Sequence, residues 1–158
     1  MKVLSKSFHE KELIPLKYTC DGENICPPLE IHEIPKNAKS LVVVMDDPDI
    51  PDFVKDKLNI DVYDHWVVFN IELEDSKSGY FEILEGVEPE GDRGSNSSGQ
   101  IKYTGPCPPD GQHRYFIKVY ALKSLIDLPT GASKAQVEKQ MDGLTVDSAE
   151  LMFFYERI

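Results

Sequence analysis

At residues 105–115 the chain reads Gly-Pro-Cys-Pro-Pro-Asp-Gly-Gln-His-Arg-Tyr, and a strand-like run continues from there to residue 122. The stretch is a turn rich in proline and polar groups that enters a β-strand at a histidine. An earlier part of the chain shares this layout, because Asp-Asp-Pro-Asp-Ile-Pro at 46–51 precedes His-Trp-Val-Val-Phe-Asn at 65–70. The chain has only four histidines. Two of them at the mouths of strands, beside carboxylates and prolines, indicate a polar pocket.

Turn signals recur along the whole chain and divide it into short stretches rich in Val, Ile, Phe and Tyr. This spacing is typical of an all-β sandwich. With 158 residues the chain has the length of one domain, and we expect residues 1–158 to form it. The predicted fold is mainly β, an antiparallel sandwich with one or two short helices. The predicted strands are 3–8, 29–32, 40–45, 65–73, 100–103, 114–122 and 149–157.

The clearest helix signal lies at residues 133–141. Ser133 is a suitable N-cap, and Gln136 stands at the third helical position of a capping box. Residues 91–99, by contrast, are rich in glycine and serine, and we interpret them as a long connection, with a lid as the alternative. Asn-Ser-Ser at 96–98 matches a glycosylation sequon, which we regard as accidental because no export signal precedes it.

Composition and charge argue against several classes of protein. The hydrophobic fraction of 41% and the charged fraction of 28% are those of an ordinary soluble protein. The longest apolar runs have the length of strands, so we expect no transmembrane segment. A net charge of −11 with scattered lysines repels phosphate backbones, which argues against nucleic-acid binding. Because the first residues lack an apolar signal core, we expect a cytoplasmic protein.

The three cysteines, Cys20, Cys26 and Cys107, contain no C-x-x-C pair. This odd set is typical neither of a zinc ribbon nor of a disulfide framework. We therefore expect reduced thiols, with a bridge between Cys20 and Cys26 as the alternative.

The residues at the two strand mouths can be assigned to faces. If the strand before residue 46 pairs antiparallel with the strand that begins at His65, then Asp47 and His65 lie at the same edge of the sheet. Because side chains alternate along a strand, His113 and Tyr115 point to one face and Arg114 points to the other. The two histidines, the aspartate and the tyrosine hydroxyl could hold a small anion if nearby carboxylates keep the histidines protonated.

Other roles for these residues are less well supported. The two histidines lack the H-x-x-x-H or H-x-H spacing of a local metal site, so we expect neither a metal nor a cofactor. Arg114 pairs most economically with Asp47 or Asp49, which would hold the acidic turn in place. Cys107 lies six residues before His113, so a hydrolase that uses this thiol, or a bound metal, remains an alternative. The bond between Ile50 and Pro51 is a candidate cis peptide.

In these stretches the chain resembles the phosphatidylethanolamine-binding protein family, in its short bacterial and archaeal branch that is often named for Raf kinase inhibitor protein. One mark is an Asp-Pro-Asp-x-Pro turn at 47–51, and a second is a Gly-x-His-Arg turn at 111–114. A third is the stretch Asp-Gly-Glu-Asn-Ile-Cys-Pro-Pro-Leu at 21–29. Gly-Pro-Cys-Pro-Pro at 105–109 matches the prokaryotic form of the family.

The resemblance implies a β-sandwich with a small pocket for phosphate-like anions or a phosphoethanolamine head group. By motif, the residues that line this pocket are Asp47, His65, Pro109, His113 and Tyr115. Asp49 and Arg114 would support its walls, and Pro51 matches a proline reported as cis in the family.

Taken together, the sequence predicts a non-enzymatic binding protein whose partner is a small anion or a phospholipid head group. As an alternative, the resemblance permits inhibition of a protease or a kinase. That function would use exposed loops such as 53–59 or 92–98 instead of the pocket.

Overall fold

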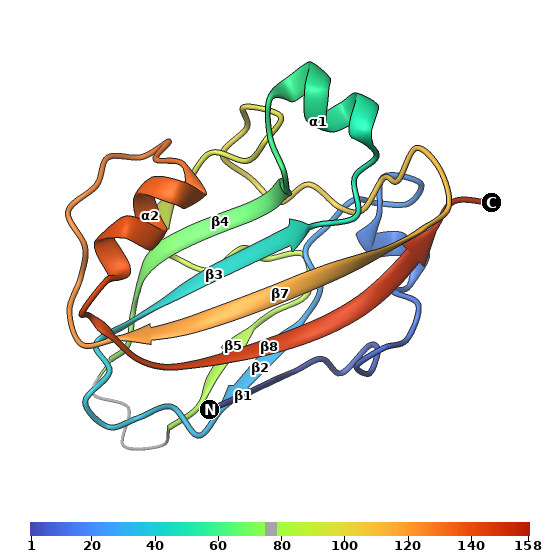
Figure 1. The fold of residues 1–158 in the computed structure, drawn as a ribbon. Coiled ribbons are helices and arrows are strands. Elements are labelled where there is room, and N and C mark those ends of the chain that lie inside the picture. The colour runs from blue at the N-terminus through green and yellow to red at the C-terminus, as the bar shows by residue number, and fades with distance from the viewer. Residues whose placement is uncertain (75–78) are drawn as a thin grey trace.

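The computed structural model describes residues 1–74 and 79–158, and within them the chain is mainly β, with two antiparallel sheets packed face to face (Figure 1). This confirms the predicted fold class. No helix in the described part of the chain is long and apolar enough to cross a membrane.

The larger sheet has five strands in the order β6-β4-β3-β7-β8. Its central strand β3 is apolar from Leu41 to Met45, and all eight of its residues are buried, so that both faces of the sheet must be covered. The strands are β3 (Ser40–Asp47), β4 (Tyr63–Glu72), β6 (Asp92–Arg93), β7 (Gln112–Leu122) and β8 (Thr145–Glu156).

A three-stranded sheet covers one face of the larger sheet. Its strands, in the order β1-β2-β5, are β1 (Lys2–Leu4), β2 (Leu29–His32) and β5 (Phe81–Ile83). The main core lies between the two sheets and includes the large buried side chains Trp66, Tyr115, Ile117 and Phe153. Alternate residues of β7 therefore point into this core, as the sequence predicted.

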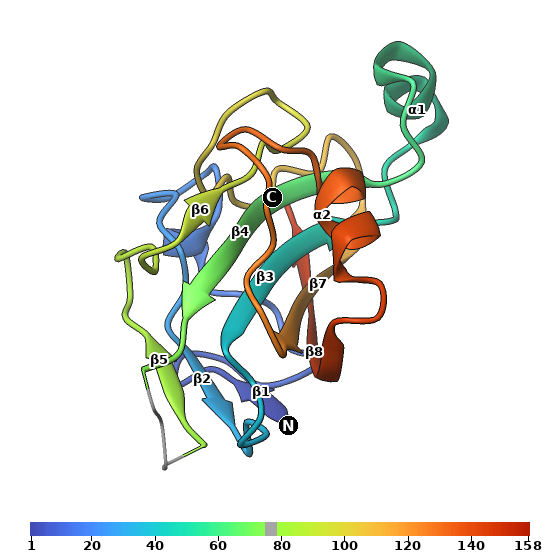
Figure 2. The same cartoon turned by 90° about the vertical axis from the view of Figure 1, so that its left-hand side faces the viewer.

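The helix α2 (Lys134–Met141) covers the other face of the larger sheet (Figure 2). Its Val137 and Met141 pack with Val42, Val44 and Phe69 in a second apolar cluster. The predicted capping box is present, because the Ser133 side chain accepts the Gln136 N–H and the Gln136 side chain accepts the Ser133 N–H. The predicted helix is confirmed.

Residues 52–58 form a second helix, where we expected an exposed loop. The helix α1 (Asp52–Leu58) begins after Pro51 and ends at Asn59, whose φ of 55° is left-handed. None of its residues is buried, and Figures 1 and 2 show it projecting from the end of the sandwich. Because no residue of α1 is buried, its sequence has only a weak apolar pattern. The helix depends instead on the proline that precedes it and on the left-handed residue that ends it.

Two strand predictions need correction, and two further strands were missed. Residues 100–103 form a bend instead of a strand, and the first strand ends at Leu4 instead of residue 8. Tyr103 is buried because its ring packs edge-on against Trp66, and its hydroxyl donates to the carbonyl of Tyr18. The short strands β5 and β6 were not predicted. They exist only through pairing with β2 and β4, which a single stretch of sequence does not show.

Asn96 holds the glycine- and serine-rich segment together. Its amide nitrogen donates to the carbonyl of Lys102 and the hydroxyl of Thr104, each at 3.0 Å. Its amide oxygen accepts the N–H groups of Ser98 and Gln100. The side chain is buried, so the sequon amide is used for folding, and the segment is an ordered connection.

Candidate anion-binding pocket

A small cavity lies where β3 ends and where β4 and β7 begin. Asp47 pairs with Tyr63 and Asp46 with Phe116, so these three strand ends meet at one edge of the sheet. The cavity has a volume of about 240 Å³. The residues that line it are Asp47, Ile50, Val54, Tyr63, His65, Thr104, Gly105, Cys107, Pro108, Pro109 and Tyr115.

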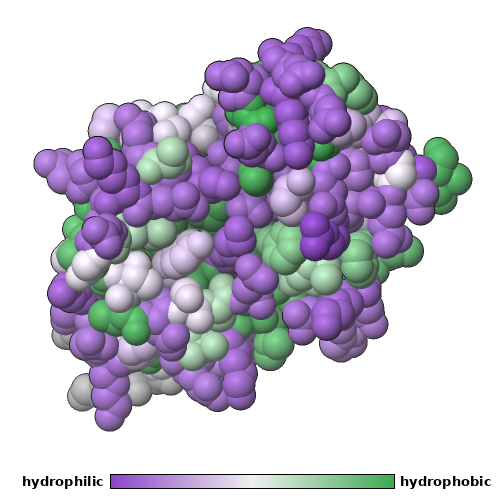
Figure 3. Space-filling model, in the orientation of Figure 1, coloured by the Kyte–Doolittle hydropathy of each residue, from purple (hydrophilic) through white to green (hydrophobic). Residues whose placement is uncertain are grey.

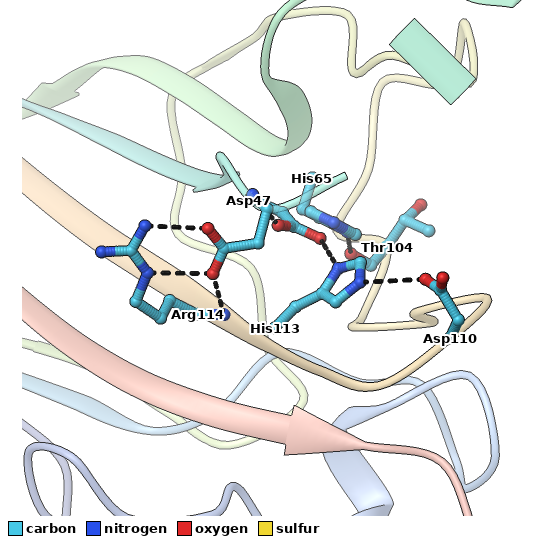
Figure 4. A network of polar contacts seen from close by, with 7 residues as sticks. Asp47, His65, Thr104, Asp110, His113 and Arg114 are labelled. Atoms are coloured by element: carbon cyan, nitrogen blue, oxygen red, sulfur yellow. Dashed lines mark hydrogen bonds and ion pairs between the residues drawn. The ribbon is translucent and has the colours of Figure 1, made fainter. Parts of the chain in front are cut away.

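A buried pair, Asp47 and His113, forms one wall of the site (Figure 4). Nδ1 of His113 lies 2.7 Å from Oδ2 of Asp47, and Oδ1 of Asp47 accepts the N–H of Asp49 at 2.7 Å. Both carboxylate oxygens are therefore used. Since Asp47 accepts from Nδ1, the ring of His113 is held with Nε2 directed outward, 3.7 Å from Oδ1 of the exposed Asp110.

The environment of Asp47 works against its ionisation. Burial raises the pKa of this carboxyl group, and the hydrogen bond from His113 opposes that rise. The ionised form of Asp47 therefore depends on its two hydrogen-bond contacts, with Nδ1 of His113 and with the N–H of Asp49.

His65 contributes a neutral ring to the cavity. Its Nδ1 lies 2.8 Å from the carbonyl oxygen of Thr104, which can only accept, so Nδ1 carries the proton. Burial lowers the pKa of His65 to about 4, so the ring is uncharged at neutral pH. Its Nε2 then presents a lone pair. The condition that both histidines are protonated is therefore not met by His65.

Tyr115 brings an unpaired hydroxyl to the cavity. Its ring stacks on Phe153, with centroids 5.5 Å apart, and meets His65 edge-on at 5.4 Å. The hydroxyl is buried, and it has no hydrogen-bond partner within residues 1–74 and 79–158. Burial and the nearby Asp47 raise the pKa of Tyr115, so the hydroxyl keeps its proton and remains a donor. A buried donor without a partner is costly unless a ligand accepts from it.

Arg114 lies outside the cavity, on the opposite face of β7, as the alternation of the strand predicted. Its Nε and Nη2 donate to the two carboxylate oxygens of Asp49 at 2.9 and 2.8 Å, and its backbone N–H donates to Asp49 as well. Of the two pairings that we expected, the structure shows the one with Asp49. The Arg114 side chain is 50% exposed, so this ion pair is not buried.

The prolines line the cavity unequally. Pro109 contacts it directly, whereas Pro51 stands outside it at the start of α1. The candidate cis bond before Pro51 is trans, as is every peptide bond in the described residues. Pro51 itself is extended, with a ψ of 158°, and it leads the chain from the acidic turn into α1.

The cysteines differ most from the prediction. Cys20 and Cys107 form a disulfide, with Cα atoms 5.4 Å apart, and Cys26 is a buried free thiol. Neither the expected set of three reduced thiols nor the alternative bridge to Cys26 is present. The two partners are 87 residues apart, so only the fold brings the loop after residue 18 against the wall of the cavity.

Nothing in the sequence indicated that several of the residues lining the cavity would lie there. Ile50, Thr104 and Pro108 lie in turns, where no periodicity assigns a side chain to a face. Tyr63 could have been found from the register of β3 and β4, because it stands opposite Asp47. His113, by contrast, was predicted to line the cavity and acts behind it, through Asp47.

A larger groove of about 990 Å³ lies elsewhere, between the ends of β4 and β5 and the segment 87–92. Its lining includes six carboxylates and none of the described lysine, arginine or histidine side chains, so it repels anions. The carboxylates are Glu72, Glu74, Glu82, Glu88, Glu90 and Asp92. The described residues contain no cluster of three or more His, Cys, Asp or Glu side chains placed to hold a metal ion.

The fold and the cavity define a class of protein, a two-sheet β-sandwich with a polar pocket at the mouths of its central strands. The family model for phosphatidylethanolamine-binding protein matches residues 4–156. The chain therefore belongs to the phosphatidylethanolamine-binding protein family.

Individual relatives agree with this assignment. The UPF0098 protein of Methanothermobacter thermautotrophicus is 42% identical, over 99% of each chain. Among solved structures, the PEBP homologue CT736 from Chlamydia trachomatis is 38% identical, covers 99% of this chain and 97% of its own, and has a TM-score of 0.89. E. coli YbcL, described as a member of the mammalian PEBP family, is 27% identical with a TM-score of 0.83 and covers 99% of this chain and 98% of its own.

Proposed function

We propose that this chain is a non-enzymatic binding protein that holds a phosphate-like group in the pocket between Asp47, His65, Pro109 and Tyr115. The observation that carries the proposal is the buried hydroxyl of Tyr115, which faces the pocket without a partner. A group with accessible oxygens would satisfy it. The small volume of about 240 Å³ suits a head group better than a drug-sized molecule.

The polar side chains suggest a specific pattern of hydrogen bonds. Tyr115 donates its hydroxyl proton to the ligand, and His113 holds Asp47 in place from behind the cavity. Nε2 of the neutral His65 can only accept. The ligand must therefore offer oxygen acceptors and one proton donor, which is the remaining proton in hydrogenphosphate and would be a neighbouring ammonium group in a phosphate ester.

The rim of the pocket favours a ligand with a positive group next to its phosphate. Asp110 stands 3.7 Å from Nε2 of His113, and its side chain is 69% exposed. None of the described lysine or arginine side chains lines the cavity. An ammonium group placed over Asp110 would balance this charge. Phosphoethanolamine carries both groups, whether free or as the head of a phospholipid.

A comparison of inorganic phosphate with sulfate tests this pattern. Sulfate has similar oxygens but carries no proton near neutral pH, so we expect phosphate to shift the NMR signals of His65 and His113 at concentrations where sulfate does not. Tyr115→Phe should weaken phosphate binding roughly tenfold, because a hydrogen bond to a charged group is lost. Tyr120→Phe, on the opposite face of the same strand, serves as the matched control.

Two results would contradict the proposal. If neither anion perturbs the histidines at millimolar concentration, the cavity is not an anion pocket. If sulfate binds as tightly as phosphate, the assignment of His65 as an acceptor is wrong.

The alternative function, inhibition of a protease or a kinase, has one supporting feature in the structure. The helix α1 projects beside the pocket and presents Phe53 at 60% exposure. The second segment proposed for this role, 92–98, is held in place by Asn96 and is less available. An inhibitor that acts through α1 would keep its activity in the Tyr115→Phe variant.

Catalysis has less support. In a hydrolase based on Cys107, the sulfur would have to be free to attack, and in this structure it is bonded to Cys20. We propose that the protein works in the cytoplasm, where small thiols are abundant and disulfides are seldom permanent. The pocket disulfide would then meet reducing thiols.

A further inference from the structure

The disulfide stands at the pocket that the proposed function uses, and the following inference rests on that function. Cys107 is an exposed residue and lines the cavity together with His65 and Tyr115. Cys20 is partly buried, in the loop that follows the 3-10 turn Leu16–Tyr18. An incoming thiol can therefore approach the sulfur of Cys107 from the pocket side.

The wall around Cys107 is held by more than the disulfide. The carbonyl of Pro106 accepts the N–H of Cys20 at 3.1 Å, and Oδ1 of Asn24 accepts the N–H of Gly105 at 2.7 Å. Gly105 also packs so closely on this loop that an added Cβ would lie 2.2 Å from the carbonyl oxygen of Tyr18. Breaking the sulfur–sulfur bond should therefore leave the sulfur of Cys107 at the pocket.

We propose that the bridge between Cys20 and Cys107 is a thiol-exchange site, at which a low-molecular-mass thiol becomes attached to Cys107 and blocks the anion pocket. The thiolate attacks Sγ of Cys107, a new sulfur–sulfur bond forms, and Cys20 leaves as a thiolate. No net oxidation or reduction takes place in this step. A second thiol can then attack the attached one, which releases a small disulfide and leaves Cys107 as a free thiol.

The direction of attack follows from exposure. Cys107 is exposed and Cys20 is partly covered, so the attached group should reside on Cys107. Cys26 is an internal control because it is buried, and burial raises its pKa to about 11. It should stay unmodified. A glutathionyl group on Cys107 would occupy the cavity of about 240 Å³ that Tyr115 also lines.

Glutathione is a suitable probe for this site. The oxidised protein is first titrated with phosphate, and it is then incubated with a mixture of reduced and oxidised glutathione. We expect one glutathionyl group on Cys107 by peptide mass spectrometry, and no phosphate binding by the modified protein at millimolar concentration. A phosphine reductant, which leaves no group behind, should break the bridge and change the phosphate affinity less than roughly twofold.

Two matched variants separate the cysteines. Cys20→Ser leaves Cys107 as a permanent thiol, so oxidised glutathione should modify this variant and abolish its phosphate binding. Cys107→Ser leaves Cys20, and glutathione should not change its phosphate binding. A glutathionyl group found on Cys20, or a modified Cys107 with unchanged phosphate affinity, would overturn the proposal.

The outcome is distinguishable from failure of the proposed function. If the oxidised protein does not bind phosphate at all, the anion pocket is wrong, and the exchange site is then judged by two other readouts. The first is the residue that carries the glutathionyl group, which should be Cys107. The second is the NMR signals of His65 and Tyr115, which should shift when Cys107 is modified. If Cys107 is not modified and these signals do not shift, the exchange site is wrong as well.

Discussion

His65 shows how one residue can depend on its surroundings for its charge. The ring lies at the start of β4, packs edge-on against Tyr115, and gives its single proton to the carbonyl of Thr104. A charged ring would have to be buried without a carboxylate partner, so the neutral form is favoured. Asp47 and His113 form the opposite case, because there a carboxylate is buried beside the ring that it orients.

The charge of His65 predicts how stability depends on pH. In the unfolded chain the pKa of this histidine is near its ordinary value of 6.5, and in the folded chain it is about 4. Below pH 6.5 the unfolded chain takes up a proton that the folded chain does not, so stability should fall as the pH drops from 6.5 to 4 and level off below. The full loss is about 3 kcal/mol.

Urea unfolding at several pH values measures this effect. Whatever the absolute stability of the His65→Gln variant, its free energy of unfolding should fall less steeply over the same pH interval. His9→Gln is the control, because His9 is exposed. Equal slopes in the wild type and the His65→Gln variant would show that folding does not lower the pKa of His65. Asp47 changes the pH dependence of stability in the opposite direction, because burial raises its pKa. Its contribution is the same in the wild type and the His65→Gln variant, so the comparison of the two removes it.

At the scale of secondary-structure elements, the pocket depends on how the turn after β3 is tied to β7. The ion pair between Arg114 and Asp49 makes this connection with three hydrogen bonds, on the face of β7 that points away from the pocket. Asp49 in turn donates its N–H to the carboxylate of Asp47. Arg114 is therefore connected to the buried carboxylate of Asp47 through Asp49.

We therefore expect Arg114→Gln to affect binding more than stability. The pair is half exposed, and its loss should change the free energy of unfolding by less than about 1 kcal/mol. Phosphate affinity should fall a few-fold, because the turn that carries Asp47 becomes looser. Asp49→Asn should have a similar effect, and the double variant should lose little more than either single one.

A matched control is Lys2→Gln, which breaks an exposed ion pair with Glu33 at the smaller sheet. It should leave phosphate binding unchanged. If Arg114→Gln also leaves binding unchanged, Arg114 does not support the pocket.

At the scale of the whole molecule, the disulfide joins an early loop to the late wall of the pocket. The same early loop contacts the end of β8, because Asp21 accepts from the hydroxyl of Tyr155 and pairs with Arg157. Loop, wall and last strand are thus connected at one end of the sandwich. The face seen in Figure 3 is mostly hydrophilic with small, scattered hydrophobic patches, as expected for a chain of net charge −11.

The double variant Cys20→Ser/Cys107→Ser tests how far this connection stabilises the fold. The bridge closes a loop of 87 residues, and its removal should lower the free energy of unfolding by up to about 4 kcal/mol, because the unfolded chain gains freedom. Urea unfolding measures the change, and the oxidised wild type is the reference. Phosphate binding by the double variant should persist wherever it is folded. No loss of stability would mean that the bridge is not formed in the protein in solution.

Local rules made much of the fold predictable. Alternation placed His113 and Tyr115 on the buried face of β7 and Arg114 on the other, and the capping box located α2 correctly. The helix α1 and the strands β5 and β6 were missed because their residues bury little surface or depend on partners. The same limit applied to the site, where strand positions were predictable and the turn residues Ile50 and Pro108 were not.

The sequence by itself determined the β-sandwich, the two strand mouths and the side chains that share a face, because these follow from patterns of two to four neighbouring residues. Only the tertiary structure decided that Cys20 meets Cys107, that Arg114 pairs with Asp49, and that His65 is neutral. Each of these depends on distance through space and on burial. Neither quantity exists until loops that are far apart in the chain have come together.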